Sequence, residues 1–170
     1  MNIALTPYAQ THEEIILLMI ANFHKHHQKL VLKQDDVYQI DNEDIKIDIA
    51  YWLQNGSIFM ITYDEVYVGY IHIGYREGEM VFHIEDIFID ENYRRRGIAE
   101  KAIQLAQEHY MQFESVKAVA IDVIPRNIAA IQLYYKLGFD SLSMVTLRKE
   151  LKGKNPRDEK VDFMGLVFKK

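Results

Sequence analysis

The sequence predicts a mixed α/β fold, in which about four helices flank a central, twisted, mostly antiparallel sheet of about seven strands. Three observations support this prediction. Residues 57–89 contain three successive runs rich in β-branched and aromatic residues. Two stretches, 15–23 and 41–54, carry apolar side chains at helical spacing. After residue 96, helical and strand-like segments alternate, which favours parallel pairing of the strands on either side of a helix.

The N-terminal part of the chain is predicted to form one strand and two helices. Residues 2–8 are typical of an edge strand, because Pro7 has no N–H to donate and stops it. A helix follows after Thr11, where apolar residues recur at helical spacing. A second helix covers 41–54, with Asp41 as its N-cap and Asn-Gly directly after it.

The middle of the chain is predicted to form an antiparallel meander. Its strands are 57–63, 67–75 and 80–89, and short polar turns separate them.

The C-terminal part returns to alternating elements. We expect helices over 96–110 and 127–137, with a buried strand over 116–124 between them. Residues 144–151 and 161–168 are predicted to form a final pair of strands, joined by a polar segment.

Composition limits the domain count and the partners. The 170 residues, 49% of them apolar, predict a single domain over 1–170 without repeats or linkers. A net charge of −5 argues against a nucleic-acid partner and suits a cationic small molecule. The absence of cysteine excludes a thiol nucleophile and is consistent with a cytoplasmic location. No apolar run is long enough for a bilayer and no secretion signal is evident, so no membrane partner is expected.

A strand followed by a short turn and an arginine-rich helix start carries the most chemical information. The apolar strand 81–89 is followed, after four residues, by Arg94-Arg95-Arg96-Gly97-Ile98-Ala99. The start of a helix offers unpaired amides and partial positive charge, and Gly97 and Ala99 leave room for an anion to approach. Guanidinium groups add matching donors. The stretch is therefore predicted to bind a diphosphate. Two other phosphate-binding loops do not fit, since a Gly-Lys-Ser/Thr ending is absent and only one of three spaced glycines is present.

The pattern Arg94-x-x-Gly97-x-Ala99 after an apolar strand resembles the coenzyme A motif of the Gcn5-related N-acetyltransferase (GNAT) family. Residues 127–139 resemble the second signature of that family, with Asn, Ala, Tyr, Gly and Phe at the expected relative positions. Two blocks in the right order, about 30 residues apart, make a coincidence improbable. The order of predicted elements matches the family's sheet over the whole chain, although 10–56 match in layout only.

The resemblance implies that the strands 80–89 and 116–124 run parallel but splay apart, and that acetyl-CoA, as co-substrate, lies in the opening. Its pantetheine arm would bond to the backbone of Ile87, Phe88 and Ile89. Its diphosphate would lie on the amides and side chains of the helix start, namely Arg94, Arg95, Arg96, Gly97, Ile98, Ala99 and Glu100.

Two further residues receive roles from the resemblance. Asn127 would contact the pantetheine or order the end of the splayed strand. Tyr134 would point at the thioester sulfur and protonate the leaving thiolate or hold it by a hydrogen bond. Packing of the Tyr134 ring under the sheet is the alternative.

An amine acceptor needs a base, because it is protonated at neutral pH. Glu85 is the candidate, since some family members that acetylate polyamines carry a catalytic glutamate at this position; a surface carboxylate is the alternative. Asp86 is the rival, but strand geometry points it to the opposite face unless a bulge intervenes. His83 shares the parity of Glu85 and would line the acceptor pocket, or is a plain strand histidine. A backbone N–H near Phe88 would stabilise the carbonyl oxygen during attack.

The sequence therefore predicts an acetyl-CoA-dependent N-acetyltransferase that acts on a primary amine of a small cationic molecule. One alternative is acetylation of a protein N-terminus or lysine, and an alternative of another class is a non-catalytic sensor that binds acyl-CoA. His24, His26 and His27 do not share one helix face, so no metal site is expected. Family members often pair as dimers, and the long terminal strands would allow a homodimer.

Overall fold

The structure, a computed structural model, describes residues 2–32, 40–75, 78, 80–152 and 159–170. The chain divides into two compact units. The first comprises residues 1–25 and 38–122, and the second comprises residues 26–37 and 123–170.

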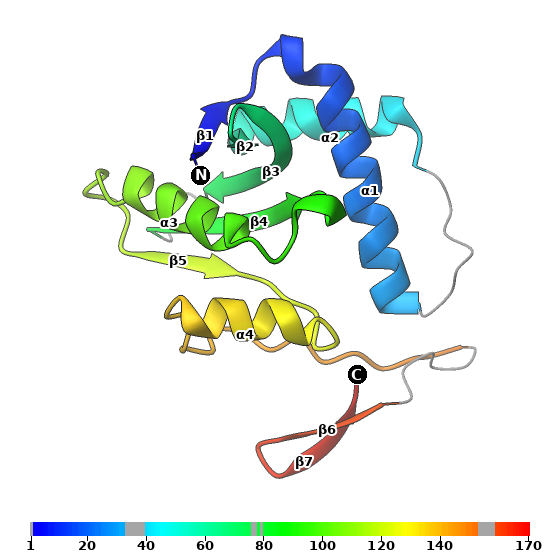
Figure 1. Cartoon of the computed structure of the whole chain (residues 1–170). Coiled ribbons are helices and arrows are strands. Elements are labelled where there is room, and N and C mark those ends of the chain that lie inside the picture. The colour runs from blue at the N-terminus through cyan, green and yellow to red at the C-terminus, as the bar shows by residue number, and fades with distance from the viewer. Residues whose placement is uncertain (1, 33–39, 76–77, 79, 153–158) are drawn as a thin grey trace. The chain divides into compact units, whose positions relative to one another are not determined.

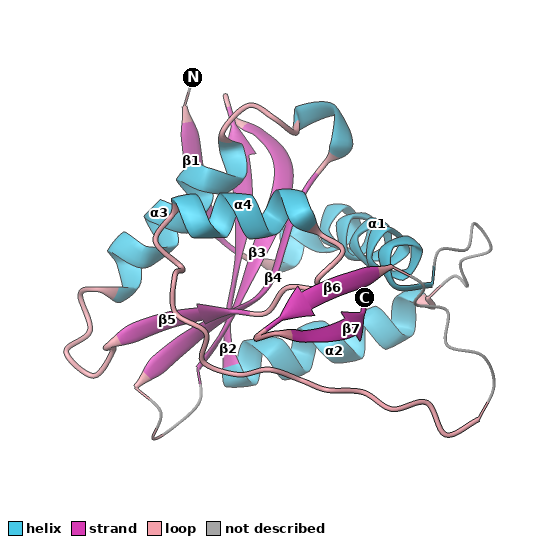
Figure 2. Cartoon of the chain, turned by 90° about the horizontal axis from the view of Figure 1, so that it is seen from below, coloured by secondary structure: helices cyan, strands magenta, loops and turns pink. Residues whose placement is uncertain are grey.

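A five-stranded sheet forms the centre of the first unit, with its strands in the order β1-β2-β3-β4-β5 (Figures 1 and 2). Neighbours from β1 to β4 run antiparallel, whereas β5 runs parallel to β4. The predicted edge strand, meander and parallel pair are thereby confirmed. The strands are β1 (Ile3–Pro7), β2 (Gly56–Tyr63), β3 (Val66–Tyr75), β4 (Val81–Ile89) and β5 (Ala118–Ile121).

The helices lie close to their predicted positions. They are α1 (Glu13–Leu32), α2 (Asn42–Asn55) and α3 (Ile98–Tyr110), with short 3₁₀ turns at Gln10–His12 and Glu91–Tyr93. Asp41 caps α2 as predicted, because its carboxylate accepts a 3.0 Å hydrogen bond from the Glu43 N–H. No helix among the described residues combines the length and the apolarity needed to cross a membrane.

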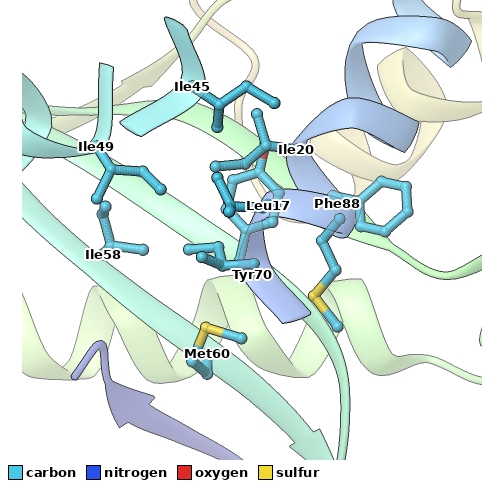
Figure 3. Close-up of a cluster of buried hydrophobic side chains, with 10 residues drawn as sticks. Leu17, Ile20, Ile45, Ile49, Ile58, Met60, Tyr70 and Phe88 are labelled. Carbon is cyan, nitrogen blue, oxygen red and sulfur yellow. The ribbon is translucent and has the colours of Figure 1, made fainter. Parts of the chain in front are cut away.

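The two faces of the sheet in the first unit are covered by different helices. On one face, side chains of α1 and α2 pack on β2, β3 and β4; Ile20, Ile45 and Tyr70 illustrate this cluster in Figure 3. On the other face the ring of Phe59 in β2 contacts His109 of α3. Each strand contributes to both layers, because successive side chains of a strand point to opposite faces of the sheet.

The strand β5 is shorter and less buried than predicted. It spans four residues instead of 116–124, and none of them is fully buried. Its pairing with β4 stops at Ile84 opposite Ile121, immediately before an irregularity in β4. A bulge bends its strand and increases the local twist, and the pairing with β5 ends where this bend begins.

The second unit contains the helix α4 (Ile128–Lys136) and a hairpin of β6 (Lys160–Phe163) and β7 (Leu166–Lys169), shown in Figure 2. The predicted final strand pair is wrong. Residues 144–151 form no strand, and 161–168 fold back on themselves.

A tight turn explains this difference. Met164 and Gly165 have φ values of 54° and 76°, which is the conformation of a two-residue hairpin turn. The apolar run therefore pairs within itself. The alternation of its side chains is the same in one long strand and in a hairpin, and only the turn distinguishes them.

Candidate active site

A β-bulge in β4 places two adjacent carboxylates on the same face of the sheet. His72 of β3 pairs with Asp86, but the next residue, Ile73, pairs with Ile84, so Glu85 is the extra residue. In a regular strand Glu85 and Asp86 would point to opposite faces. The bulge removes that alternation, and both side chains line one pocket.

The pocket lies in the first unit, between α1, α2, β3 and β4, and has a volume of about 540 Å³. Its walls include the aromatic side chains of Tyr51, Trp52 and Tyr75. No lysine or arginine is among the described residues that line it. A cavity of this size with carboxylates and aromatic rings suits a small cationic ligand.

His72 forms the inner wall beside Asp86. The residue is only 6% exposed, and its ring stacks on the Trp52 indole, with centroids 4.3 Å apart and planes inclined by 17°. The Nδ1 atom lies 3.7 Å from Oδ2 of Asp86, which is too long for a hydrogen bond, and it has no hydrogen-bond partner among the described residues.

The Asp86 carboxylate also affects the pKa of the buried Tyr70 hydroxyl. Burial raises the pKa of Tyr70 well above its usual range, and the negative charge of Asp86 raises it further. The Tyr70 hydroxyl has no hydrogen-bond partner within the part of the chain that the structure describes. Asp86 is therefore not neutralised by a hydrogen bond from Tyr70.

The Glu85 side chain lies against Gly74 of the neighbouring strand, where no side chain obstructs it. A Cβ atom on Gly74 would lie 2.7 Å from Oε1 of Glu85 and 3.1 Å from its Cγ. Both distances are shorter than ordinary contacts, so the Glu85 side chain rests on the glycine of the neighbouring strand. Glycine inside a strand often marks such a close approach.

Beyond the bulge, one edge of β4 has no strand partner among the described residues. The Asp90 N–H donates to the Val68 carbonyl at 2.8 Å. Bonded pairs alternate along an antiparallel ladder, so Phe88 also directs its backbone groups toward β3. Ile87 and Ile89 direct theirs to the opposite edge, where the pairing with β5 has already ended.

The parallel pairing of β4 and β5 is as predicted, and it ends at Ile84 and Ile121, before the part of β4 that was expected to bind the cofactor. Of the three residues expected to present backbone groups, Ile87 and Ile89 direct theirs away from β3, although the Ile89 carbonyl already accepts a hydrogen bond from Arg94 Nε, whereas the amide of Phe88 faces β3. A carbonyl oxygen in the opening would therefore meet the N–H groups of the neighbours of Phe88.

The start of α3 has the form expected of an anion site. Gly97 is the N-cap, with a left-handed φ of 75°, and a Cβ atom there would contact nothing within 4 Å. The first intrahelical bond joins the Lys101 N–H to the Gly97 carbonyl at 3.0 Å. The amides of Ile98 and Ala99 have no acceptor among the described residues. These groups fit a diphosphate, which accepts hydrogen bonds from such amides.

The three arginines before Gly97 differ in their contacts. Arg94 Nε donates to the Ile89 carbonyl at 2.9 Å, and Arg96 Nη2 donates to the Asn92 carbonyl at 3.0 Å, so both side chains brace the turn. Arg95 has a left-handed φ of 60° and forms no ion pair or side-chain hydrogen bond with the described residues. Arg95 is exposed, so its guanidinium is accessible to a phosphate.

Two predicted site residues belong to the second unit. Asn127 is the N-cap of α4, because its Oδ1 accepts a 3.3 Å hydrogen bond from the Ala130 N–H. Tyr134 lies on α4 with its ring against Phe139, and burial raises its pKa to about 12. Its hydroxyl therefore stays protonated at neutral pH. The capping role of Asn127 was readable from its position before an apolar helix.

The pocket also contains residues that sequence reasoning did not select. His72 and Gly74 were overlooked because a histidine and a glycine in an apolar strand give no distinctive signal. Trp52 lies within the predicted helix 41–54, and it lines the pocket together with Tyr51. His83 pairs with Gly74 across the strands but is not among the pocket-lining residues.

Comparison with known proteins places the chain in a family. The description "Acetyltransferase (GNAT) family" matches residues 23–139, which is more than half of the chain. The chain belongs to this family. Both motif regions lie in the matched GNAT segment, as does the bulged strand β4.

Curated relatives match the GNAT chain over a shorter stretch. A spermine/spermidine N(1)-acetyltransferase of Bacillus subtilis (strain 168) is 30% identical over 56 residues, which are 33% of this chain and 37% of that protein. A probable spermine N(1)-acetyltransferase of Bacillus subtilis subsp. natto (strain BEST195) is 29% identical over the same length. The match thus spans little more than a third of these relatives.

Solved structures share the fold over most of the chain. A possible acetyltransferase from Clostridium difficile 630 has a TM-score of 0.71 and 16% identity, with 89% of this chain and 99% of that chain covered. The AAC(6')-Iy structure, in complex with a bisubstrate analog, has a TM-score of 0.67 and 19% identity, with 88% and 99% covered. These likenesses show that the chain has the GNAT fold.

Proposed function

We propose that this chain transfers an acetyl group from acetyl-CoA to a primary amine of a small cationic molecule, with residues 1–170 acting as one domain. The observation that carries the proposal is the bulge in β4, which holds Glu85 and Asp86 in one pocket next to an edge of the same strand that has no strand partner among the described residues. The relatives named for spermine and spermidine, and the aminoglycoside enzymes among the similar folds, support a small amine.

Acetyl-CoA supplies the acetyl group as a thioester, and the chain supplies the groups that bind it. The amides of Ile98 and Ala99 and the side chain of Arg95 would hold the diphosphate. The backbone of Ile87 and the N–H of Ile89 would bond to the pantetheine arm as an added strand does. Asn127 is proposed to order this region from the start of α4.

Glu85 is proposed to take one proton from the acceptor ammonium, so that the neutral nitrogen can attack the acetyl carbon. The new N–C bond forms as the C–S bond breaks. The second proton of the nitrogen passes to the sulfur, and coenzyme A leaves as a thiol. The transfer is direct and needs no nucleophile from the protein, which agrees with the absence of cysteine.

Tyr134 is proposed to hold the leaving sulfur by a hydrogen bond. Its pKa of about 12 is well above that of an alkyl thiol, about 8.5. Full proton transfer from the phenol to the thiolate would therefore be uphill by roughly 5 kcal/mol. A hydrogen bond from the neutral hydroxyl stabilises the developing negative charge without that cost.

The test is acceptor-dependent thiol release from acetyl-CoA, measured with linear diamines, an aminoglycoside, a lysine-containing peptide and a peptide with a free N-terminus. The proposal predicts release with the small cationic amines and little with the peptides. Release with peptides alone would support the protein acetyltransferase alternative. Binding of acetyl-CoA in calorimetry without release by any amine would support the sensor alternative.

A further inference from the structure

The second carboxylate of the pocket, Asp86, is more enclosed than the proposed base. Its side chain is 17% exposed, whereas Glu85 belongs to the exposed residues. A carboxylate withdrawn from water is costly unless a cation or hydrogen-bond donors compensate it. No lysine or arginine among the described residues lies within ion-pair distance of Asp86.

The side chain nearest to this carboxylate is held rigidly but does not satisfy it. His72 is 94% buried, with its ring stacked on Trp52. Its Nδ1 lies 3.7 Å from Oδ2 of Asp86, which is too far for a hydrogen bond, and has no hydrogen-bond partner within the described part of the chain. Asp86 and His72 thus form a polar wall in which the described residues leave the His72 Nδ1 without a hydrogen bond.

Aromatic rings extend this wall. Trp52 stacks on His72 and lines the same pocket, and the rings of Tyr51 and Tyr75 are exposed around it. An ammonium group near a carboxylate and an indole is attracted by both. The wall therefore has the chemistry of a cation subsite, and it is separate in function from Glu85, whose proposed partner is the reacting amine.

We propose that Asp86, backed by His72 and Trp52, binds a second, non-reacting ammonium group of the acceptor, so that the site selects amines with two or more cationic nitrogens. This inference rests on the proposed function. A monoamine that reaches Glu85 leaves Asp86 without a counter-charge, whereas the second ammonium group of a diamine supplies one. The pocket, at about 540 Å³, has room for such a molecule.

The first test compares three acceptors of similar length: putrescine, n-butylamine and 4-aminobutanol. The last two lack the second charge, and 4-aminobutanol keeps a polar end. We expect the wild-type chain to prefer putrescine in kcat/KM by about 10- to 100-fold, the range for a hydrogen bond to a charged group. Replacement Asp86→Asn, which keeps the shape but removes the charge, is expected to erase that preference by raising KM for putrescine.

Glu65→Gln is the matched control, because Glu65 is an exposed carboxylate in the β2–β3 turn and does not line the pocket. It is expected to retain the wild-type preference. A wild-type chain that uses all three amines equally would overturn the second subsite and leave the proposed function intact. A decrease of kcat by Asp86→Asn that is equal for all three amines would also overturn it, since Asp86 would then act on the reaction and not on the second charge.

A second test needs no turnover. Trp52 is the single tryptophan of the chain, so its fluorescence reports on this pocket alone. Putrescine added without acetyl-CoA is expected to change the emission of the wild type in a saturable way and to bind Asp86→Asn at least about tenfold more weakly. Equal binding of putrescine and n-butylamine by the wild type would refute the subsite. Absence of thiol release with every amine, despite selective diamine binding, would instead refute the proposed function.

Discussion

The replacement Gly74→Ala tests whether the position of the Glu85 carboxylate matters, without a mutation of Glu85 itself. The added methyl group would lie 2.7 Å from Oε1 of Glu85, and ordinary contact begins at 3.4 Å, so the carboxylate has to move by at least about 0.7 Å. Misplacement of a catalytic group by about 1 Å can cost on the order of 100-fold in rate. We therefore expect kcat/KM for small amines to fall by about 10- to 100-fold.

The same replacement is expected to leave the fold nearly unchanged. The displaced atoms are the end of an exposed, flexible side chain, and alanine reduces the conformational freedom of the unfolded chain relative to glycine. The free energy of unfolding, measured by denaturant titration, should change by less than about 1 kcal/mol. Glu85→Gln provides the reference, with an expected loss of about 100- to 10,000-fold in kcat.

Gly69→Ala is the contrasting control in the same strand. Its methyl group would lie 2.1 Å from the Phe88 carbonyl oxygen, which belongs to the backbone ladder and cannot turn away. That variant is expected to unfold or to lose several kcal/mol of stability. If Gly74→Ala retained full activity while Glu85→Gln lost it, the predicted contact between the glycine and the carboxylate would be wrong. If both retained it, Glu85 would not be the base.

Four further outcomes are expected. Gly97→Val should weaken acetyl-CoA binding by more than about 100-fold in calorimetry, because a β-branched side chain is strained at a φ of 75° and blocks the approach to the α3 amides; unchanged affinity would refute the diphosphate site. Tyr134→Phe should lower kcat by about 10- to 100-fold with little change in acetyl-CoA affinity. The pH–rate profile of this variant should keep the shape of the wild-type profile up to about pH 10, since the pKa of Tyr134 is about 12. A shift of the alkaline limb in the variant would contradict this assignment. The pKa of Tyr134 in the folded state lies above the usual value of 10.0, so the free energy of unfolding is expected to fall as the pH rises from 10 toward 12. This decline should be less steep in Tyr134→Phe than in the wild type. Equal declines in the variant and the wild type would contradict this prediction. Tyr70→Phe removes a buried hydroxyl without a partner among the described residues and should be neutral or stabilising by up to about 1 kcal/mol, whereas a loss above about 2 kcal/mol in thermal unfolding would show that the hydroxyl is satisfied.

Local sequence signals were sufficient for most of the first unit. The N-cap Asp41, the glycine after α2 and the polar turns of the meander act within a few residues of one another, so the sequence alone locates them. The same is true of Gly97, whose left-handed φ at the start of α3 agrees with the predicted anion site. These features depend on short-range sterics and hydrogen bonding.

Longer-range features were not predictable in the same way. The bulge at Glu85 depends on how β3 and β4 align, and nothing in the order of residues in β4 marks which one is extra. Pure alternation would have placed Asp86 on the opposite face and hidden the second carboxylate. The roles of His72 and Gly74 likewise follow from cross-strand neighbours that only the register reveals.

The hairpin of the second unit shows a related limit. Its apolar alternation is equally compatible with a long strand, and Met164 carries no typical turn signal even though it adopts a φ of 54°. The segment that was expected to pair with it, 144–151, consequently forms no strand.

The central claim is that the purified chain moves the acetyl group of acetyl-CoA onto a small cationic amine through Glu85. Mass spectrometry of the product formed from isotopically labelled acetyl-CoA and putrescine, alongside thiol release, measures this transfer directly. The account predicts labelled N-acetylputrescine in amounts equal to the thiol released, and strongly reduced amounts of both with Glu85→Gln. Thiol release without labelled amine, or equal product from the Glu85→Gln variant, would contradict it.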